Sequence, residues 1–559
     1  MRRIYTFIAV LAIAVSAAAN TRSPKNEVAR NLDIFNALYK ALQTSYVDTI
    51  DATASINTAI YSMLADIDPY TEYYPEDDQE EFTVISTGEY GGIGSNIMQR
   101  LNPDRRTPKE PTRVTNPRKG TPSAKAGLLP GDVFLTIDGD TVTSLMSSKV
   151  SEKLKGQPGT TVHITVRRPY AEDSILSFDV VREKISINPV PYFGMMQNGT
   201  TGYINLETFN EKSAPAVRDA LVELKKQGAK ELILDLRGNP GGILEGAVQI
   251  AGFFLPKGTE VVRTRGRGLV NEKTYKTTER PIDTEIPLVV LTDASTASSS
   301  EILSGALQDL DRAVVIGERS FGKGLVQSSR PLPYNGLLKV TIARYYTPSG
   351  RCVQAIDYSH RNPDGSVSRV PDSLTNVFHT AKGRVVRDGG GITPDITIKR
   401  PEMSRLVFNI VNGLWDLDYA IKYRAGHPTV LPPDQFEITD SIYEDFKTFI
   451  NPDEFKYDRV CEMIIDELEK AAEVEGYQNE QVKETITSLR SQLRHDLSHD
   501  LDIHREEIAT YLAREIMNNY YHDEGRIQQS LRFDKDIEKA LEILSDPAAY
   551  KAILTPPLD

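Results

Sequence analysis

The stretch PLVVLTDASTASSSE, residues 287–301, carries the strongest signal for fold and chemistry in this chain. Its apolar start predicts a buried strand, and the small residues after it predict a turn. An apolar face over residues 302–310 then predicts a helix. The first N–H groups of a helix lack intrahelical acceptors and favour negative charge, so a serine at this junction lies beside donors for an oxyanion. Ser298 is therefore a candidate nucleophile. The alternative is that Ser298 and Glu301 form only a capping box.

A second stretch, FGKG at residues 321–324, places Lys323 between two glycines. Gln327 lies four residues further on, and in an extended segment both side chains share one face, so the amide can orient the amine. A lysine acts as a general base only when neutral, which requires burial to lower its pKa. An isolated FGKG would instead indicate a surface lysine in a glycine turn. No histidine occurs between His163 and His360, and a Ser/Lys pair is the arrangement that needs none.

A third stretch, DLRGNPGG at residues 235–242, follows an apolar strand and precedes a helix. Paired glycines let backbone N–H groups approach a ligand closely. We expect Gly241 or Gly242, together with the N–H of Ser299, to form an oxyanion hole. The alternatives are a plain strand-to-helix turn or a phosphate-binding loop, but the spacing fits neither a P-loop nor a dinucleotide fingerprint.

The surrounding sequence predicts a multidomain α+β protein, because 559 residues suggest three or four domains. Strand and helix signals alternate over residues 186–400, which indicates an α/β core. A helical segment (26–80) and a β-rich module (88–185) precede the core. A charged helical extension (401–559) follows it and either mediates a homodimer, which we favour, or packs on the core.

The motifs together resemble the C-terminal processing peptidases, or tail-specific proteases. The resemblance covers about residues 32–400 and rests on the order of the stretches LADIDP (64–69), GEYGGIG (88–94), AGLLPGD (126–132), DLRGNPGG, the serine and lysine stretches, YTPSGR (346–351) and GITPD (391–395). It implies a crotonase/ClpP-like catalytic core with an inserted PDZ domain, a serine endopeptidase activity and no cofactor.

The resemblance also assigns roles to individual residues. It implies that Ser298 is the nucleophile, that Lys323, 25 residues later, is the base, and that Gln327 orients the lysine. Ser299 replaces the alanine that usually follows the nucleophile. Three serines thus stand in a row, and the spacing to the lysine is what favours Ser298.

The stretch Gly92-Ile93-Gly94 resembles the carboxylate-binding loop of PDZ domains. Its N–H groups would hold a terminal carboxylate, and the peptide would add as a strand beside residues 95–98. The expected partners are thus polypeptides with free C-termini. Arg167 or Arg168, at the end of a predicted strand, would link a docked peptide to the core; the alternative is a solvated strand end. For the glycines, the alternative is a simple hairpin.

The N-terminus predicts export. Two arginines, an apolar run over residues 4–15 and three alanines form a signal peptide over residues 1–19, which places the protein in the periplasm. The alternative is a retained anchor that holds the protein at the membrane.

The net charge and the cysteine and histidine residues argue against nucleic-acid binding, a disulfide and a metal site. A net charge of −13 argues against nucleic-acid binding. Cys352 and Cys461 are not expected to pair. His495, His499 and His504 suggest a metal site or, as we expect, a solvated helix face, so no metal is predicted.

Two other functional classes compete with a peptidase. One is a binding protein that has kept the PDZ module and lost catalysis, which the intact Ser298, Lys323 and Gln327 disfavour. The other is an acyl-CoA enzyme, since glycine-rich oxyanion holes also serve thioesters. The predicted export disfavours that class, because an exported enzyme would lack the cytosolic substrate.

Overall fold

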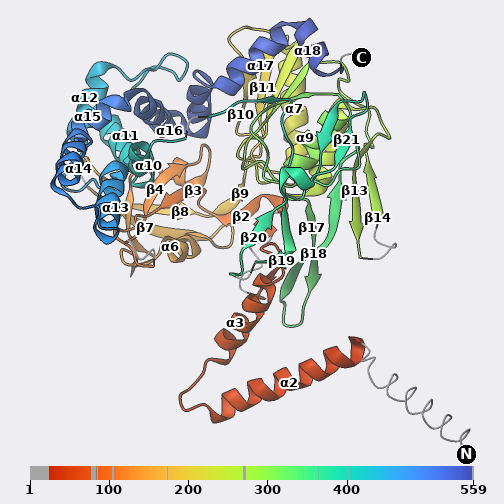
Figure 1. Ribbon diagram of the computed structural model, residues 1–559, viewed down its shortest axis with the longest axis horizontal. Coiled ribbons are helices and arrows are strands. Elements are labelled where there is room, and N and C mark those ends of the chain that lie inside the picture. The colour runs from red at the N-terminus through yellow and green to blue at the C-terminus, as the bar shows by residue number, and fades with distance from the viewer. Residues whose placement is uncertain are drawn as a thin grey trace, which may run out of the picture. The chain divides into compact units, whose positions relative to one another are not determined.

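A computed structural model describes residues 24–76, 83–84, 86–102, 106–172, 174–267, 272–362, 364–400 and 402–556 (Figure 1). The predicted signal peptide, residues 1–19, lies outside the described residues. The chain divides into two compact units, one formed by residues up to 76 with residues 328–340 and the other by the rest of the chain. Among the described residues, no helix combines the length and apolarity that a membrane span requires.

The first unit contains the predicted N-terminal helical segment. It forms two helices, α2 (Pro24–Ser45) and α3 (Ala52–Ala65), and a short strand, β1 (Glu72–Tyr74). Asp51 begins α3 by accepting a hydrogen bond from the N–H of Ala54 at 2.9 Å, as N-cap residues do. Strand β1 pairs antiparallel with residues 337–339.

The β-rich module forms a sheet in the order β3-β4-β5-β7-β8, which leaves β3 at one edge. Its strands are β3 (Ser95–Met98), β4 (Arg113–Pro117), β5 (Val133–Ile137), β6 (Asp140–Thr141, beside β5), β7 (Thr161–Arg167) and β8 (Ile175–Val181), and its helices are α5 (Pro122–Ala126) and α6 (Ser147–Leu154). A hairpin-like pair, β2 (Glu89–Gly92) with β9 (Glu183–Ser186), brings the two ends of the module together. Alternate residues of β7 are buried, as expected for a sheet with one covered face.

The predicted α/β core is built on a six-stranded sheet in the order β10-β11-β12-β15-β16-β23. The strands are β10 (Tyr192–Met195), β11 (Thr201–Asn205), β12 (Glu231–Asp235), β15 (Leu288–Thr292), β16 (Val314–Gly317) and β23 (Ile396–Thr397). All pairs from β11 onward are parallel. Every residue of β11 and β15 is buried, which requires cover on both faces.

Two sets of helices provide that cover. Helices α7 (Ser213–Lys226), α8 (Leu244–Phe254) and α9 (Ser299–Asp309) pack on one face, where Leu232, Leu234 and Val290 point. Helices α17 (Lys535–Ser545) and α18 (Pro547–Ile553) pack on the other, where Ile233 and Val289 point (Figure 1). Part of the C-terminal extension therefore packs on the core.

The rest of that extension has a hydrophobic core of its own, with Tyr419, Phe446 and Leu512 among its buried members. Its helices are α10 (Arg405–Asn412), α11 (Trp415–Gly426), α12 (Asp440–Phe449), α13 (Val460–Val474), α14 (Glu480–Gln492), α15 (Leu497–Ile503) and α16 (Arg505–Leu531). Helix α16 is interrupted at His522, with φ +58° and ψ −156°, and its last turns reach the core sheet through Ile527.

The remaining strands lie outside the six-stranded sheet. They are β13 (Glu260–Gly266), β14 (Glu272–Lys276), β17 (Leu325–Pro331) and β18 (Leu337–Tyr346), then the pairs β19 (Ile356–Arg361) with β20 (Val367–Arg369) and β21 (Val377–His379) with β22 (Val385–Arg387). Residues 356–387 thus form two small antiparallel pairs. The multidomain α+β architecture, with an α/β core, a β module and a helical extension, is confirmed.

Candidate active site

Ser298 occupies the turn between strand β15 and helix α9, as predicted. Its φ of +56° lies where non-glycine residues are uncommon, a strain that clusters at functional sites and costs on the order of 1–3 kcal/mol. The side chain is half-buried. The Ser298 N–H donates to the Glu301 carboxylate at 2.9 Å, so the capping box considered above is present.

The Glu301 carboxylate joins the serine and lysine stretches. Its Oε2 accepts from the N–H of Ser298 at 2.9 Å and from the N–H of Lys323 at 2.8 Å. Because one oxygen accepts both bonds, the two backbone nitrogens are no farther apart than the sum of these distances. Its Oε1 accepts from Gly322 N–H at 2.7 Å and from the Ser320 hydroxyl at 2.5 Å. Residues far apart in the sequence are thereby held side by side.

Burial raises the pKa of Glu301, while the four donors oppose that effect by stabilising the ionised form. The sequence identified Glu301 only as a capping residue. Its position at the third residue of the predicted helix indicated this capping role. The sequence pattern did not show that the lysine loop folds onto Glu301.

The glycines on either side of Lys323 are required by close packing. A Cβ on Gly322, where φ is +89°, would lie 2.3 Å from the Ala355 Cβ, and one on Gly324 would lie 2.7 Å from the backbone nitrogen of Gln354. Lys323 itself is half-buried. The amide of Gln327 donates to the Thr341 hydroxyl at 3.1 Å, so the expected contact between Gln327 and the lysine stays a prediction.

The predicted oxyanion glycines lie against the nucleophile. A Cβ on Gly241, where φ is +96°, would lie 2.7 Å from the Ser298 Cβ and 2.9 Å from the Ser299 nitrogen. The Gly241 N–H already donates to the Asn239 side chain at 2.9 Å. Within the described part of the chain, the N–H groups of Gly242 and Ser299 have no acceptor. Gly242 is therefore a better donor candidate than Gly241.

Asn239, which sequence reasoning did not single out, connects the glycine turn to the serine turn. Its fully buried side chain donates to the Leu206 carbonyl at 2.7 Å, besides accepting from Gly241. Its carbonyl accepts from the Ala297 N–H at 3.0 Å and from the Ser300 hydroxyl at 3.1 Å. The two turns that flank the reaction centre are thus one bonded unit.

The PDZ-like loop has the features that a carboxylate-binding site needs. Among the described residues, the N–H groups of Ile93 and Gly94 have no acceptor. Gly94 has φ +75°, and a Cβ there would lie 2.5 Å from the Thr121 Cβ. Ile93 is 3% exposed and anchors the loop in the module's core, whereas Gly92 is paired in β2. The loop leads directly into the edge strand β3.

Comparison with known proteins identifies the family and three of its domains. Residues 200–367 match the model of peptidase family S41, residues 113–168 that of the PDZ domain, and residues 406–544 that of the C-terminal helical domain of probable PDZ-proteases. The carboxy-terminal-processing protease of Bartonella bacilliformis is 34% identical over 364 residues, which cover 64% of this chain and 81% of that protein. The chain belongs to the carboxy-terminal-processing proteases.

Other relatives carry similar descriptions. The carboxyl-terminal-processing protease of Picosynechococcus is 37% identical over 292 residues, which cover 52% of this chain and 68% of that protein. The solved structure of a photosystem II D1 C-terminal processing protease is 28% identical, with a TM-score of 0.36 and coverage of 65% of this chain and 86% of that one. This chain is a serine-type peptidase with a PDZ domain.

The two arginines considered as sensors in this protease differ in their surroundings. Arg168 donates twice to the buried Asp132 carboxylate, at 2.8 Å each, and to the Gly127 carbonyl at 2.8 Å. Its described hydrogen bonds therefore all lie inside the PDZ domain. Arg167 is exposed and lines a cavity of about 270 Å³ that also includes Asp418 of the helical domain.

Two histidines of the histidine-rich segment of the protease lie beside carboxylates. His495 Nδ1 lies 2.8 Å from the Asp500 carboxylate, and His504 Nδ1 lies 3.8 Å from Glu507. Across the described ranges, no three His, Cys, Asp or Glu side chains are grouped to hold a metal ion. Cys352 and Cys461 are both free thiols.

Proposed function

We propose that this protease hydrolyses peptide bonds through Ser298 and Lys323, in polypeptides whose free C-terminus binds the PDZ loop. The contact that carries the proposal is the Glu301 oxygen bonded to the backbone of both residues. Lys323, in its neutral form, takes the hydroxyl proton as Ser298 Oγ attacks the carbonyl carbon. The N–H groups of Gly242 and Ser299 stabilise the oxyanion.

The remaining steps follow from the same groups. The tetrahedral intermediate collapses, the C–N bond breaks, and the lysine ammonium returns its proton to the leaving amine. Water then attacks the acyl-enzyme and loses a proton to Lys323. The C–Oγ bond breaks, the acid product leaves, and the lysine ammonium returns this proton to Ser298 Oγ. Gln327 orients the lysine amine in this scheme.

Substitution of the two residues tests the proposal. Ser298→Ala and Lys323→Ala should each reduce kcat on an unfolded polypeptide by about 10³-fold or more, with circular dichroism unchanged. Ser295→Ala is the matched control, because Ser295 lies in the same turn and is exposed. Activity close to that of the control in either variant would refute the assignment.

Recognition of C-termini has its own test. A peptide with a free, apolar C-terminus should be cleaved faster than its amidated twin, because the amide removes the charge that the N–H groups of Ile93 and Gly94 bind. The docked peptide shifts the population of PDZ orientations toward the one it binds best. Equal rates for the two peptides would exclude this recognition and leave the Ser/Lys chemistry untouched.

We also propose that the protein is exported to the periplasm, on the basis of its first 19 residues. The mature protein should then begin at Asn20 and be found in the soluble periplasmic fraction. A membrane-bound protein that begins at Met1 would show instead that the apolar segment is retained as an anchor.

A homodimer through the helical domain is proposed from helix α13. Val460, Met463, Ile464 and Leu468 form a stripe at helical spacing and are between 39% and 59% exposed. A second copy would cover this stripe. The wild type should sediment as a dimer and Ile464→Glu as a monomer. A monomeric wild type at micromolar concentration would contradict the proposal.

A further inference from the structure

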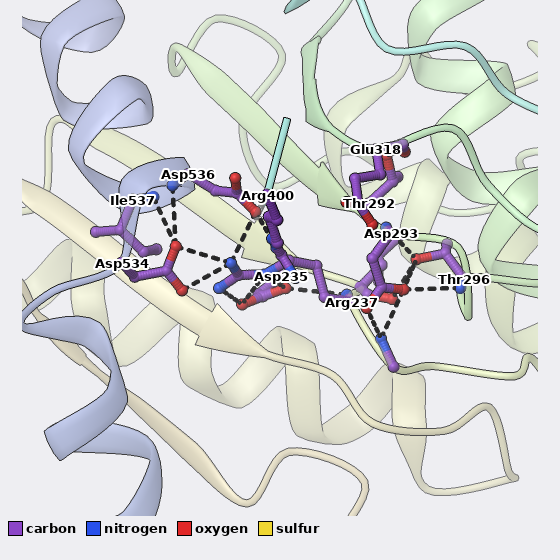
Figure 2. A network of polar contacts seen from close by, with 12 residues as sticks. Asp235, Arg237, Thr292, Asp293, Thr296, Glu318, Arg400, Asp534, Asp536 and Ile537 are labelled. Atoms are coloured by element: carbon purple, nitrogen blue, oxygen red, sulfur yellow. Dashed lines mark hydrogen bonds and ion pairs between the residues drawn. The ribbon is translucent and has the colours of Figure 1, made fainter. Parts of the chain in front are cut away.

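Arg237, in the DLRGNPGG stretch, is held by carboxylates from two distant parts of the chain (Figure 2). Its Nε and Nη2 donate to Asp235 at 2.6–3.0 Å. Its Nη1 donates to Asp534 at 2.7 Å and to Asp536 at 2.9 Å, both at the start of helix α17. Arg400 forms an ion pair with the same Asp536.

The network is largely removed from water. The side chain of Arg237 is 13% exposed and that of Asp536 is 1% exposed. Burial by itself would lower the pKa of Arg237, but Asp235 and Asp534 raise it well above its ordinary value. The guanidinium is paired by Asp235 on one side and by Asp534 and Asp536 on the other, so the carboxylates of the helical domain contribute to fixing where it lies.

Arg237 lies at the beginning of the turn that ends in the oxyanion glycines. The next residue, Gly238, donates its N–H to the Asp293 carboxylate at 3.0 Å, and the Leu236 carbonyl accepts from the Thr296 hydroxyl at 2.9 Å. Further along the turn, Asn239 bonds to Gly241 and to Ala297. The position of Arg237 is therefore transmitted through hydrogen bonds to both turns at the reaction centre.

We propose that Asp534 and Asp536 are positioning residues for the peptidase reaction. They hold Arg237 so that the turn over residues 236–242 presents the N–H of Gly242 beside that of Ser299. The inference rests on the proposed function, because it assigns the oxyanion to these donors. It gives the helical domain a role in catalysis, since neither aspartate belongs to the S41-matching segment.

Neutral isosteres test the proposal in the full-length protein. Asp534→Asn, Asp536→Asn and the double variant remove charge with little change of shape. Asparagine at position 534 also still caps helix α17, where Asp534 accepts from the N–H of Asp536 at 2.9 Å. Removal of a whole oxyanion donor costs about 10²–10³-fold in kcat, so a displaced donor should cost about 10–100-fold, with KM unchanged.

A second measurement separates positioning from loss of fold. A peptide aldehyde adds to the serine hydroxyl to give a hemiacetal whose oxygen occupies the oxyanion position. Its affinity should fall in parallel with kcat, whereas binding of the uncleaved peptide in a Ser298→Ala background should not change. Glu542→Gln is the matched control, since Glu542 is 64% exposed on the same helix and pairs with Lys539.

The outcomes are distinct. If the double variant keeps a normal kcat, or loses activity through KM alone with unchanged aldehyde affinity, the positioning role is refuted. If substitution of Asp536 prevents folding, Asp534→Asn alone decides, because its side chain is 19% exposed. An active Ser298→Ala variant would overturn the proposed function, whereas an inactive one beside a fully active double variant would overturn only this inference.

Discussion

The two faces of the catalytic sheet are covered by very different parts of the chain. Helices α7, α8 and α9 cover the first face and lie between the strands in sequence. Helices α17 and α18 cover the second and begin at residue 535, more than two hundred residues after β16. Yet one strand, β12, supplies Leu234 to the first face and Ile233 to the second, and both side chains are fully buried. The helical domain is therefore a structural part of the peptidase.

Removal of the helices that cover the second face of the sheet should have the largest effect on folding and activity. Deletion of residues 402–559 would expose the apolar face that carries Ile233 and Val289, and we expect a product without cooperative unfolding or activity. Solubility, near-UV circular dichroism and peptidase assays measure this. Deletion of residues 460–492 is the control, because α13 and α14 supply no residue to that face. A truncated core that folds and cleaves peptide would show that the helical domain is not needed to cover the second face.

Single truncations on β12 compare the two faces directly. Leu234→Ala and Ile233→Ala should each lower the free energy of unfolding by about 2–5 kcal/mol, because each leaves a cavity in a close-packed cluster. Urea denaturation measures both values. If Ile233→Ala lowers the free energy of unfolding by less than about 1 kcal/mol while Leu234→Ala lowers it by about 2–5 kcal/mol, the second face is loosely packed.

A buried carboxyl makes one contribution to the stability of the helical domain dependent on pH. Burial raises the pKa of Asp416 to about 8, and the nearby Glu515 adds to the shift. The folded state then holds this proton more tightly than the unfolded chain, whose aspartate titrates near about 4. The contribution of Asp416 to the stability of the helical domain is therefore fully present below about pH 4 and is lost as the pH rises to about 8.

The variant Asp416→Asn should reduce that dependence. It should be more stable than the wild type at pH 8, by up to a few kcal/mol, and close to it at low pH, as measured by urea midpoints at both pH values. Asp453→Asn is the control, because Asp453 is exposed. Parallel pH dependences in the wild type and Asp416→Asn would show that this carboxyl does not titrate as expected.

The smallest expected effect is that of a chelator. The region between His163 and His360, which includes the proposed catalytic residues, has no histidine, and His495, His499 and His504 all lie in the helical domain. EDTA should leave both activity and the unfolding midpoint unchanged. A loss that zinc restores would make the histidine segment a metal site and give the helical domain a second role.

The local features of this protein could be predicted from its sequence. The apolar run into a small-residue turn placed Ser298 between a strand and a helix, and the resemblance to the C-terminal processing peptidases, through the spacing to Lys323, favoured it among three serines. Strand and helix alternation predicted the α/β core, and the glycines at 92 and 94 predicted the PDZ loop. These features depend on residues close together in the chain, so their periodicity and spacing express them directly.

Contacts between residues far apart in the sequence were established only by the folded structure. The Leu-Ile-Leu run at residues 232–234 showed that both faces of β12 are buried, but an apolar pattern does not name the surface that covers it. The sequence also leaves hydrogen-bond partners undetermined, because a buried donor can pair with any acceptor that the fold brings within reach. Chain folding therefore assigned Glu301 to the lysine loop, Asn239 to Gly241, and Asp534 to Arg237.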